Sequence, residues 1–272
     1  MPEGPECEIT ARSLNQRLKG KYLVKLKFDK PVKSKNLENI KFPLKIKRVE
    51  ARAKKICFIL GKSKMLVSSP LMTGMWSYKK WDYHRMTMIV ADDVLGRFVV
   101  NAQEVYYSDR RIMGNIVYLQ NQDMIDTYFK KFGPDILHTE VSAKEWVKIF
   151  SKPTVQKKQI AVALLEPNII GGVGNYQKAD IPYLAKVSPH TLVKDISAKR
   201  LEKIRVLAHK IIRKALAGGG LTIGDYYSPE GYPGNYKPAI YGLKEDKLGN
   251  KVKNDKDSKG RGNHWVPEVQ IY

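Results

Sequence analysis

Cysteine is almost absent from this sequence of 272 residues, which contains only Cys7 and Cys57. Two cysteines exclude a disulfide scaffold and a four-cysteine zinc site, and we expect both to pack as small hydrophobic side chains. Long apolar runs are also missing, since none approaches the ~20 residues that a membrane span needs. Residues 1–15 are polar and carry acids, unlike a signal peptide. We therefore expect an intracellular protein that is neither secreted nor inserted in a membrane.

Acidic residues are scarce relative to basic ones. The chain has 27 Asp and Glu against 49 Lys and Arg, which gives a formal net charge of +22. This charge indicates a polyanionic partner, with nucleic acid first and an anionic membrane surface second. The membrane surface is the weaker interpretation, because the chain has no concentrated basic amphipathic helix. The hydrophobic content of 43% is sufficient for one large domain or two ordinary domains.

The first six residues, MPEGPE, form the most informative stretch. An initiator methionine is usually removed before a residue as small as proline, which would leave Pro2 as an N-terminal secondary amine. An α-amino group has a pKa near ~8, so a useful fraction is neutral and can attack a sugar C1′ to form a Schiff base. Glu3 follows it and is a candidate acid/base. The structural alternative is that Glu3 and Glu6 are first-turn charges of a helix.

The first half of the chain predicts one helix followed by many strands. Residues 5–19 place Ala11, Leu14 and Leu18 on one helical face, and Gly20 ends the run. Apolar and polar residues then alternate with period two, which is typical of an antiparallel sandwich or barrel with one solvated, lysine-rich face. The expected strands lie within residues 24–28, 44–47, 56–60, 65–68, 86–90, 98–101 and 105–107.

The second half of the chain predicts helices. Apolar residues in 124–132 have helical spacing and Gly133-Pro134 ends this run, so we place the domain boundary at residues 130–141. Ser142 and Glu145 form a capping-box pattern at the start of the next helix. We expect further helices over 154–165 and 196–216, a helix that begins near Asn175, and a closing hairpin with arms at Val252 and Trp265.

Three turns of the first half contain candidate DNA-binding residues. Lys54 precedes an apolar strand and is either a phosphate contact or a solvated lysine on an edge strand. Met72 lies in a turn with a second methionine and a tryptophan, a composition more typical of a core. Arg111 and Met113 belong to the turn 109–114, where arginine and apolar side chains suit a wedge that enters DNA. A surface loop with a structural aspartate is the alternative there.

A glycine-rich turn, residues 169–175, joins two expected helices of the second half. Backbone N–H groups at the start of the second helix, together with the Asn175 side chain, suit a DNA phosphate. Glycine turns also join helices in proteins that do not bind DNA, and the net charge favours the DNA interpretation. His264 is expected to be a surface or packing histidine, because a single histidine without nearby cysteine is weak evidence for zinc.

Taken together and in order, these segments resemble the formamidopyrimidine-DNA glycosylase / endonuclease VIII family of base-excision repair enzymes. The start of the chain resembles the endonuclease VIII side, whereas the loop 225–234 resembles the formamidopyrimidine side. The segments that carry the resemblance are 2–6, 53–54, 72–74, 109–114, 133–135, 164–165, 172–175, 187–189, 219–242 and 260–262.

The resemblance implies an α+β fold. An N-terminal antiparallel β-sandwich with flanking helices is expected over residues 1–130, and a linker over 131–141. A helical domain is expected over 142–272, with a helix-two-turns-helix unit and a β-hairpin finger at about 239–272. We expect a monomer with no cofactor and no metal.

The resemblance also implies functional residues. The damaged base is flipped out of the helix, because its glycosidic carbon cannot be reached inside the stack. Pro2 is then the nucleophile, Glu3 the general acid/base, and Glu6 supports the site. Lys54, Asn175 and Arg261 are expected to bind the phosphates that flank the lesion, and Lys54 and Arg261 are also counted among the catalytic residues. Met72, Arg111 and Met113 are expected to fill the void left by the flipped nucleotide.

The activity implied is that of a bifunctional glycosylase and abasic-site lyase. Such an enzyme excises oxidised bases, mainly oxidised pyrimidines and ring-opened purines, and cleaves the strand by β,δ-elimination through the Schiff base. Its partner is double- or single-stranded DNA that contains oxidised bases or abasic sites, in the nucleus, nucleoid or viral compartment. The alternative is a non-catalytic protein that binds damaged or kinked DNA and keeps Asn175 and Arg261 without an active Pro2.

The chain departs from the family pattern at its C-terminus. Val266 and Val269 occupy places where the zinc-finger form has cysteines, and the first cysteine pair is also missing. The resemblance therefore predicts a zincless finger, a hairpin held by strand pairing and by residues such as Trp265. Within the helix that follows Asn175, Pro182 is expected to cause a kink.

Overall fold

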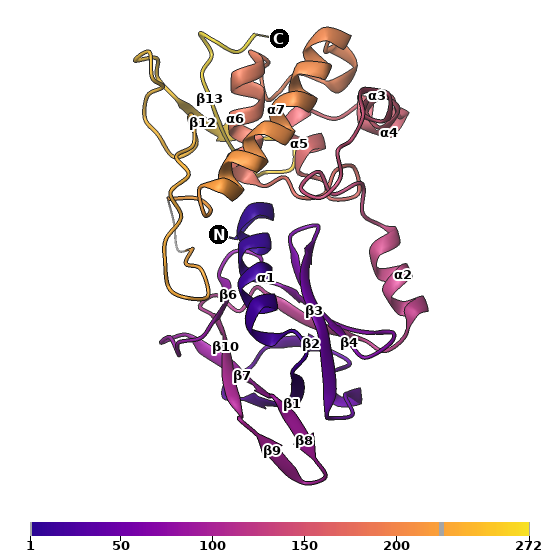
Figure 1. Ribbon diagram of the computed structural model, residues 1–272. Coiled ribbons are helices and arrows are strands. Elements are labelled where there is room, and N and C mark those ends of the chain that lie inside the picture. The colour runs from indigo at the N-terminus through magenta and orange to yellow at the C-terminus, as the bar shows by residue number, and fades with distance from the viewer. Residues whose placement is uncertain (1, 223–225, 272) are drawn as a thin grey trace. The chain divides into compact units, whose positions relative to one another are not determined.

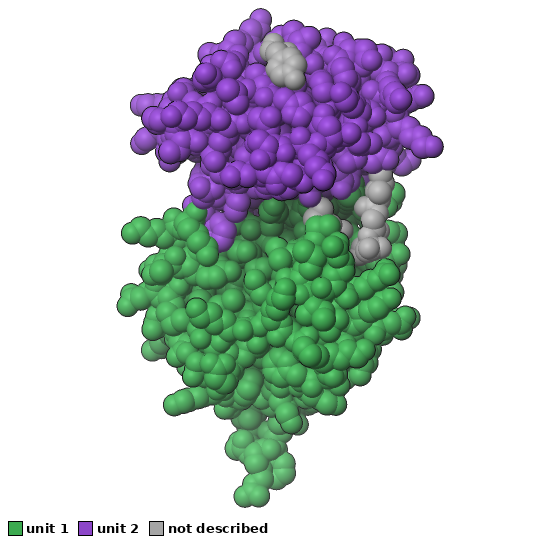
Figure 2. Space-filling view, turned by 180° about the vertical axis from the view of Figure 1, so that it is seen from behind, with its two compact units in different colours: residues 1–131, 219–235 green, residues 132–218, 236–272 purple. Residues whose placement is uncertain are grey.

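A computed structural model describes residues 2–222 and 226–271 (Figure 1). The chain forms two compact units, Met1–Lys131 with Gly219–Asn235 and Phe132–Gly218 with Tyr236–Tyr272, which are coloured separately in Figure 2. The first unit is dominated by a β-sheet and the second by helices, so the expected α+β class is confirmed. Of the helices within the described ranges, none combines the length and hydropathy required to cross a bilayer.

The sheet of the first unit contains nine strands in the order β2-β11-β5-β4-β3-β1-β7-β10-β6. All its neighbouring strands are antiparallel except β2 and β11, and a separate hairpin is formed by β8 and β9. Two helices accompany the strands, α1 (Gly4–Leu18) and α2 (Gln122–Lys130). The strands are β1 (Tyr22–Phe28), β2 (Lys33–Lys35), β3 (Leu44–Arg52), β4 (Lys55–Leu60), β5 (Lys64–Ser69), β6 (Gly74–Ser77), β7 (His84–Ala91), β8 (Asp93–Leu95), β9 (Phe98–Val100), β10 (Gln103–Asp109) and β11 (Asn115–Leu119).

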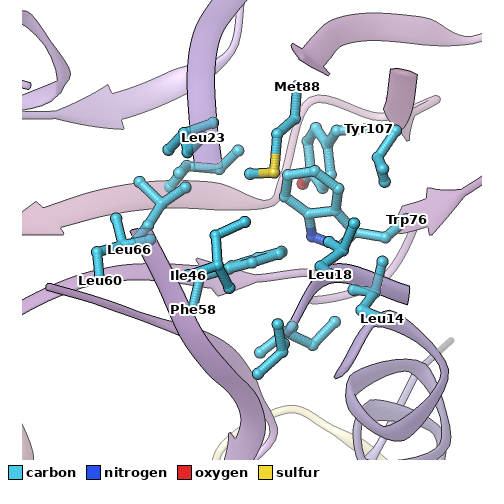
Figure 3. Packing of buried hydrophobic residues seen from close by; sticks show 14 of the residues in the cluster. Leu14, Leu18, Leu23, Ile46, Phe58, Leu60, Leu66, Trp76, Met88 and Tyr107 are labelled. Carbon is cyan, nitrogen blue, oxygen red and sulfur yellow. The ribbon is translucent and has the colours of Figure 1, made fainter. Parts of the chain in front are cut away.

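Within the described residues, the two halves of this sheet are joined where β1 pairs with β3, and they enclose one core. Trp76, Met88 and Tyr107 from one half meet Ile46 and Phe58 from the other, together with buried leucines of α1 (Figure 3). The alternation that predicted the strands explains this packing: at the start of β3, Leu44 and Ile46 are buried while Lys45 and Lys47 are exposed. After a register shift between Ile46 and Arg48, the buried positions are Val49 and Ala51. The sheet therefore folds over itself as a sandwich.

The second unit is built from helices around an apolar core that includes Trp146, Ile170 and Ile204. Its first helix begins at the predicted capping box, in which the Ser142 N–H donates to Glu145 Oε2 at 3.0 Å and the Glu145 N–H donates to Ser142 Oγ at 3.3 Å. The elements are α3 (Ala143–Phe150), α4 (Pro153–Gln156), α5 (Ile160–Leu165), α6 (Asn175–Ala185), α7 (Ala198–Ala217), β12 (Lys253–Lys256) and β13 (Gly262–Trp265).

The helix expected over 154–165 is wrong in one respect, because it is broken between α4 and α5. The break pairs with a distant segment: the Ile160 N–H donates to Thr191 O at 2.9 Å, and the Val193 N–H donates to Lys158 O at 2.9 Å. Strand-like pairing with residues 191–193 therefore replaces a helical turn. Pro182 lies inside α6, which continues to Ala185.

The division into units differs from the expected domains in two segments. Residues 219–235 belong with the first unit, where the Tyr78 N–H donates to Pro229 O at 3.1 Å. The expected linker is packed in the second unit: the Gly133 N–H donates to Pro167 O and the Gly171 N–H to Pro134 O, both at 2.8 Å. Long-range backbone pairing of this kind has no local signal in the sequence.

The closing hairpin is confirmed and rests on a small apolar cluster. β12 and β13 pair antiparallel, and Val252 and Val266 are buried with Ala179 and Ile240. Val269, the second position expected to carry cysteine in a zinc finger, packs against the same cluster. Hydrophobic contact therefore stabilises the base of this hairpin.

Candidate active site and nucleic-acid interface

The N-terminal residues are held by the carboxylate of Glu6. Glu6 is fully buried at the start of α1, and its Oε2 accepts the Glu3 N–H at 2.9 Å. Its other oxygen, Oε1, accepts the Leu221 N–H at 2.9 Å. Both oxygens are thus used to fix backbone, and the Glu3 side chain, only 3% exposed, is confined next to Pro2. The structure brings these three predicted residues together.

The segment after Gly219 completes this arrangement. Gly220 has φ +96°, and a Cβ there would meet the Tyr226 ring at 2.8 Å and Glu6 Oε1 at 3.2 Å, so only glycine fits without displacement. Burial, together with the nearby Glu6 charge, raises the pKa of Tyr226 well above its ordinary range. The family resemblance leads us to expect that the loop 221–234 lines the pocket for the flipped base; of this loop, residues 223–225 lie outside the described residues.

A narrow cavity of about 10 Å³ adjoins Pro2. That volume admits no more than about one water. The cavity is lined from β4 by Ile56, two residues after Lys54, and from the turn before β6 by Thr73. Pro2 therefore shares a cavity with residues that adjoin or belong to two of the three turns in which the sequence indicated DNA-binding residues.

Lys54 lies in the two-residue turn between β3 and β4. Ala53 and Lys54 both have positive φ, 46° and 63°, and Arg52 pairs with Lys55 across the turn. Two consecutive residues with φ above zero define a type I′ turn, which normally selects Asn-Gly. The chain accepts an unfavourable backbone here to present a half-buried lysine at the tip, which is a pattern associated with functional positions.

A buried aspartate organises the loop between β10 and β11. Asp109 is 1% exposed; its Oδ2 accepts the Gly114 N–H at 2.8 Å and its Oδ1 accepts the Arg111 N–H at 3.2 Å. The Thr73 hydroxyl donates to Asp109 Oδ1 at 2.5 Å and accepts the same Arg111 N–H at 3.1 Å. These bonds join the turn that contains Met72 to the loop of Arg111.

The tip of the same loop is strained. Ile112 has φ 51°, a conformation that a β-branched side chain rarely adopts, and it is 37% exposed. Arg111 is exposed, while Met113 and Met72 are half-buried. The structure therefore groups the three residues assigned to the void of the flipped nucleotide on two connected turns.

In the second unit, Asn175 is the first residue of α6, directly after Gly174. The Gly174 N–H donates to Gln177 Oε1 at 2.7 Å, which fixes the entry into the helix. The preceding turn is held by residues 133–136, where the Ile136 N–H donates to Gly171 O at 3.2 Å. Asn175 is half-buried in this rigid turn at a helix N-terminus, a position suited to an anion.

Arg261 lies in the loop of the hairpin, beside two residues that sequence reasoning missed, Asp257 and Lys178. Asp257 Oδ1 accepts the N–H of Lys259 at 2.8 Å and that of Arg261 at 3.0 Å. Burial alone raises the pKa of Asp257, but these bonds and the charges of Lys178 and Arg261 outweigh it, so the pKa lies below its ordinary value. The Asp-x-x-Gly spacing was a turn signal that could have identified Asp257; Lys178 left no such signal.

No group of three or more His, Cys, Asp or Glu side chains within residues 2–222 and 226–271 is placed to hold a metal ion. Cys7 and Cys57 are both buried in the first unit. His264 packs against Tyr241 with a ring separation of 4.7 Å, as a packing histidine does.

Two family models match the chain. The formamidopyrimidine-DNA glycosylase N-terminal domain matches residues 1–116, and the formamidopyrimidine-DNA glycosylase H2TH domain matches residues 132–226. Among curated relatives, the formamidopyrimidine-DNA glycosylase of Histophilus somni (strain 2336) is 25% identical over 268 residues, which cover 93% of each chain. That of Prochlorococcus marinus (strain MIT 9312) is 27% identical over 260 residues, covering 93% of this chain and 80% of the relative.

Solved structures show the same fold. The MutM (Fpg) protein of Thermus thermophilus matches with a TM-score of 0.85 at 22% identity, covering 99% of this chain and 98% of that one. A variant of Lactococcus lactis Fpg in complex with DNA containing Fapy-dG matches with a TM-score of 0.84 at 24% identity over the full length of both chains. With both family models matched in order, the chain belongs to the formamidopyrimidine-DNA glycosylase / endonuclease VIII family and is a DNA glycosylase of base-excision repair.

Proposed function

We propose that this protein is a bifunctional DNA glycosylase and abasic-site lyase whose nucleophile is the amine of Pro2. The observation that carries the proposal is the confinement of Glu3 beside Pro2 by a fully buried Glu6. A nucleophile with an adjacent acid/base held in place by a third group is the arrangement that covalent catalysis requires.

The proposed reaction begins when the Pro2 nitrogen forms a bond to C1′ as the glycosidic bond breaks, and the base leaves with a proton. Opening of the sugar ring, assisted by Glu3, gives a Schiff base in which the C2′ proton is acidic. Loss of that proton expels the 3′ phosphate by β-elimination. A second elimination, the δ-elimination, then expels the 5′ phosphate. Hydrolysis then frees Pro2 and leaves a gap of one nucleotide.

The DNA-contacting roles are also proposals. Lys54, Asn175 and Arg261 hold the phosphates that flank the lesion, and the left-handed turn of Lys54 and the helix N-terminus at Asn175 support this role. Insertion of Met72, Arg111 and Met113 into the void of the flipped nucleotide is supported by the bonds that tie their two turns together.

The proposed substrates are DNA containing oxidised pyrimidines, ring-opened purines or abasic sites, bound by a monomer. Support comes from relatives of the same fold, since L. lactis Fpg has been solved with DNA containing Fapy-dG, an oxidised pyrimidine or an abasic site. The net charge of +22 provides the electrostatic attraction for the phosphate backbone.

The hairpin is proposed to work as a zincless finger. Its base is supported by the fully buried Val266 and by Gln270, whose Oε1 accepts the Val266 N–H at 2.7 Å and whose Nε2 donates to Val187 O at 2.9 Å. Treatment with a strong zinc chelator is expected to leave the melting temperature and the DNA affinity unchanged. Elemental analysis that finds one zinc per chain, with loss of binding on chelation, would contradict this.

The proposed function is tested by borohydride trapping on an oligonucleotide with one abasic site. The protein with a processed N-terminus is expected to form a covalent adduct, whereas Pro2→Thr and a form that retains Met1 are not. Gel analysis of the cleaved strand is expected to show phosphate at both ends of the gap, as β,δ-elimination requires.

Two outcomes would overturn parts of the proposal. Specific binding without an adduct, from protein whose N-terminus is shown to be Pro2, would favour a non-catalytic protein that recognises damaged DNA. An adduct that survives both Pro2→Thr and retention of Met1 would favour a lysine as the nucleophile. Lys54 is the first candidate, because it lies two residues before Ile56, which lines the cavity at Pro2.

A further inference from the structure

A lysine is buried in the middle of α6. The Lys178 side chain is 1% exposed, and its Nζ donates to Gly262 O at 2.7 Å and lies 3.6 Å from Asp257 Oδ2. Lysine is almost never fully buried unless it is paired, and burying such a pair carries a large desolvation penalty for each ion. Replacement of both members of such a pair by apolar residues is often neutral or favourable for stability, so the pair calls for a reason other than folding.

The partner of Lys178 controls the loop that carries Arg261. Asp257 bonds the loop backbone through Oδ1, and its N–H donates to Arg261 O at 2.8 Å. Its Oδ2 lies 3.5 Å from Arg261 Nε, so a single carboxylate faces both cations. The Arg261 side chain is 39% exposed, whereas Asp257 is fully buried.

Charge balance explains why two cations are needed. An arginine beside a lone aspartate would be a neutral pair, and a DNA phosphate approaching it would meet no net charge. With Lys178 the group has two cations and one carboxylate, which leaves one positive charge, and Arg261 is the member that is exposed. The phosphate can therefore be attracted to the guanidinium.

Geometry adds a second effect. Lys178 lies three residues after Asn175, which places both on one face of α6. The bond from Lys178 to Gly262, the first residue of β13, fixes the hairpin against that face. Lys178 itself is too buried to touch DNA, so any effect on binding must pass through its neighbours.

We infer that Lys178 is a positioning residue for Arg261: it holds the hairpin loop on α6 beside Asn175 and neutralises Asp257, so that Arg261 keeps its charge for a DNA phosphate. This inference rests on the proposed phosphate contact of Arg261. It assigns to Lys178 and Asp257 the task of ordering the finger loop, through an ion pair within the protein.

The test measures affinity for a duplex that contains a tetrahydrofuran abasic analogue, at several salt concentrations. Lys178→Met is expected to weaken binding about tenfold and to reduce the slope of log K against log salt by about 0.9, the value for one phosphate contact. Lys210→Met, which removes an exposed lysine of α7, is the control for loss of general charge. Circular dichroism and melting establish that each variant is folded.

Two double variants separate positioning from a general structural role. In Lys178→Met/Asp257→Asn both charges are gone and Arg261 is no longer neutralised, so affinity is expected to recover to within about 3-fold of wild type. In Lys178→Met/Arg261→Gln the lysine change is expected to add nothing to Arg261→Gln. If Lys178→Met alone does not fold, the affinity of Lys178→Met/Asp257→Asn can still be compared with that of the wild type.

The inference is overturned if Lys178→Met weakens binding equally with and without Arg261, or if removing Asp257 gives no recovery. Wild-type affinity in Arg261→Gln would overturn it as well, through Arg261 itself. Excision of an oxidised base by the same wild-type preparation reports separately on the proposed function, so failure of the two is distinguishable.

Discussion

Two loops carry candidate DNA-contacting arginines, and each is built around a buried aspartate that is satisfied in a different way. In the first unit, the Asp109 carboxylate receives neutral donors, the Thr73 hydroxyl and the backbone N–H groups of Arg111 and Gly114. The charged Arg85 donates to the Asp109 backbone carbonyl instead. In the second unit, Asp257 also receives backbone N–H groups but faces two cations as well. The same side chain thus serves as a loop organiser with two kinds of partner.

The two loops differ in how the arginine keeps its positive charge. Asp109 accepts a hydrogen bond from the Arg111 backbone N–H. Among the described residues, no carboxylate forms a salt bridge with the exposed Arg111 side chain. Arg261 shares its aspartate, so a third group, Lys178, is required to leave a net charge. We therefore expect the first loop to respond to loss of hydrogen bonds and the second to loss of charge balance.

The largest effect is expected when a substitution in the catalytic site of the first unit is compared with a substitution of a DNA contact in the second unit. Glu3→Gln removes the candidate acid/base and is expected to slow base excision by about 10²–10⁴-fold in single-turnover assays. It keeps the Pro2 amine, so borohydride trapping on a preformed abasic site should persist. Arg261→Gln is the matched opposite, with weaker binding but near-normal excision at saturating enzyme. Equal loss of excision in both variants at saturation would remove the distinction.

A smaller effect is expected on stability, and it compares the aspartates directly. Asp109→Asn replaces one carboxylate oxygen by an NH₂ group, which cannot accept a hydrogen bond from the neutral donors of the loop. This change is expected to lower the free energy of unfolding by about 1–3 kcal/mol. Asp257→Asn keeps Oδ1 for the loop but leaves a buried Lys178 without its counter-charge, at a cost of about 3–5 kcal/mol. Urea unfolding, followed by a spectroscopic signal from each unit, measures both losses in the free energy of unfolding.

The control is a second change at Lys178. Adding Lys178→Met to Asp257→Asn is expected to restore most of the lost free energy of unfolding, because no uncompensated charge remains. Adding the same lysine change to Asp109→Asn should give a simple sum. An equal response in the two backgrounds would mean that the buried charges do not interact.

Local signals in the sequence explain what could be predicted. Alternation along β3, the capping box at Ser142, and the apolar face of α7 each lie within one element, and each was confirmed. Strand β11 was missed, although it lies between β2 and β5 in the sheet. The MPEGPE start indicated three residues that the structure groups at the beginning of α1.

Features that depend on distant partners could not be predicted. The break between α4 and α5 is set by pairing with residues 191–193, and the placement of 219–235 by contacts such as that of Leu221 with Glu6. Lys178 and Asp257 are separated by most of the second half of the chain, and a lysine in a helix is normally read as solvated. Only the fold reveals that this lysine is buried.

The smallest effect concerns pH and should be confined to the second unit. Burial lowers the pKa of His209, an effect that the charge of Glu140 opposes. The unfolded state therefore takes up the proton more readily, so stability is lost as pH falls from the unfolded pKa of ~6.5 through the lower folded value. We expect a fall in melting temperature on the order of 2–4 °C between neutral and mildly acidic pH. His209→Gln should reduce this dependence and leave the part that is due to His264, whose pKa is also lowered by burial.

The central claim, that Pro2 forms the covalent bond to DNA, is tested most directly by locating the bond. The borohydride-reduced complex with abasic DNA is digested with protease and nuclease, and the modified peptide is sequenced by mass spectrometry. We expect one adduct, on the N-terminal nitrogen of a peptide that begins with Pro2. An adduct on Lys54, or on any other lysine, with an unmodified Pro2 would contradict it.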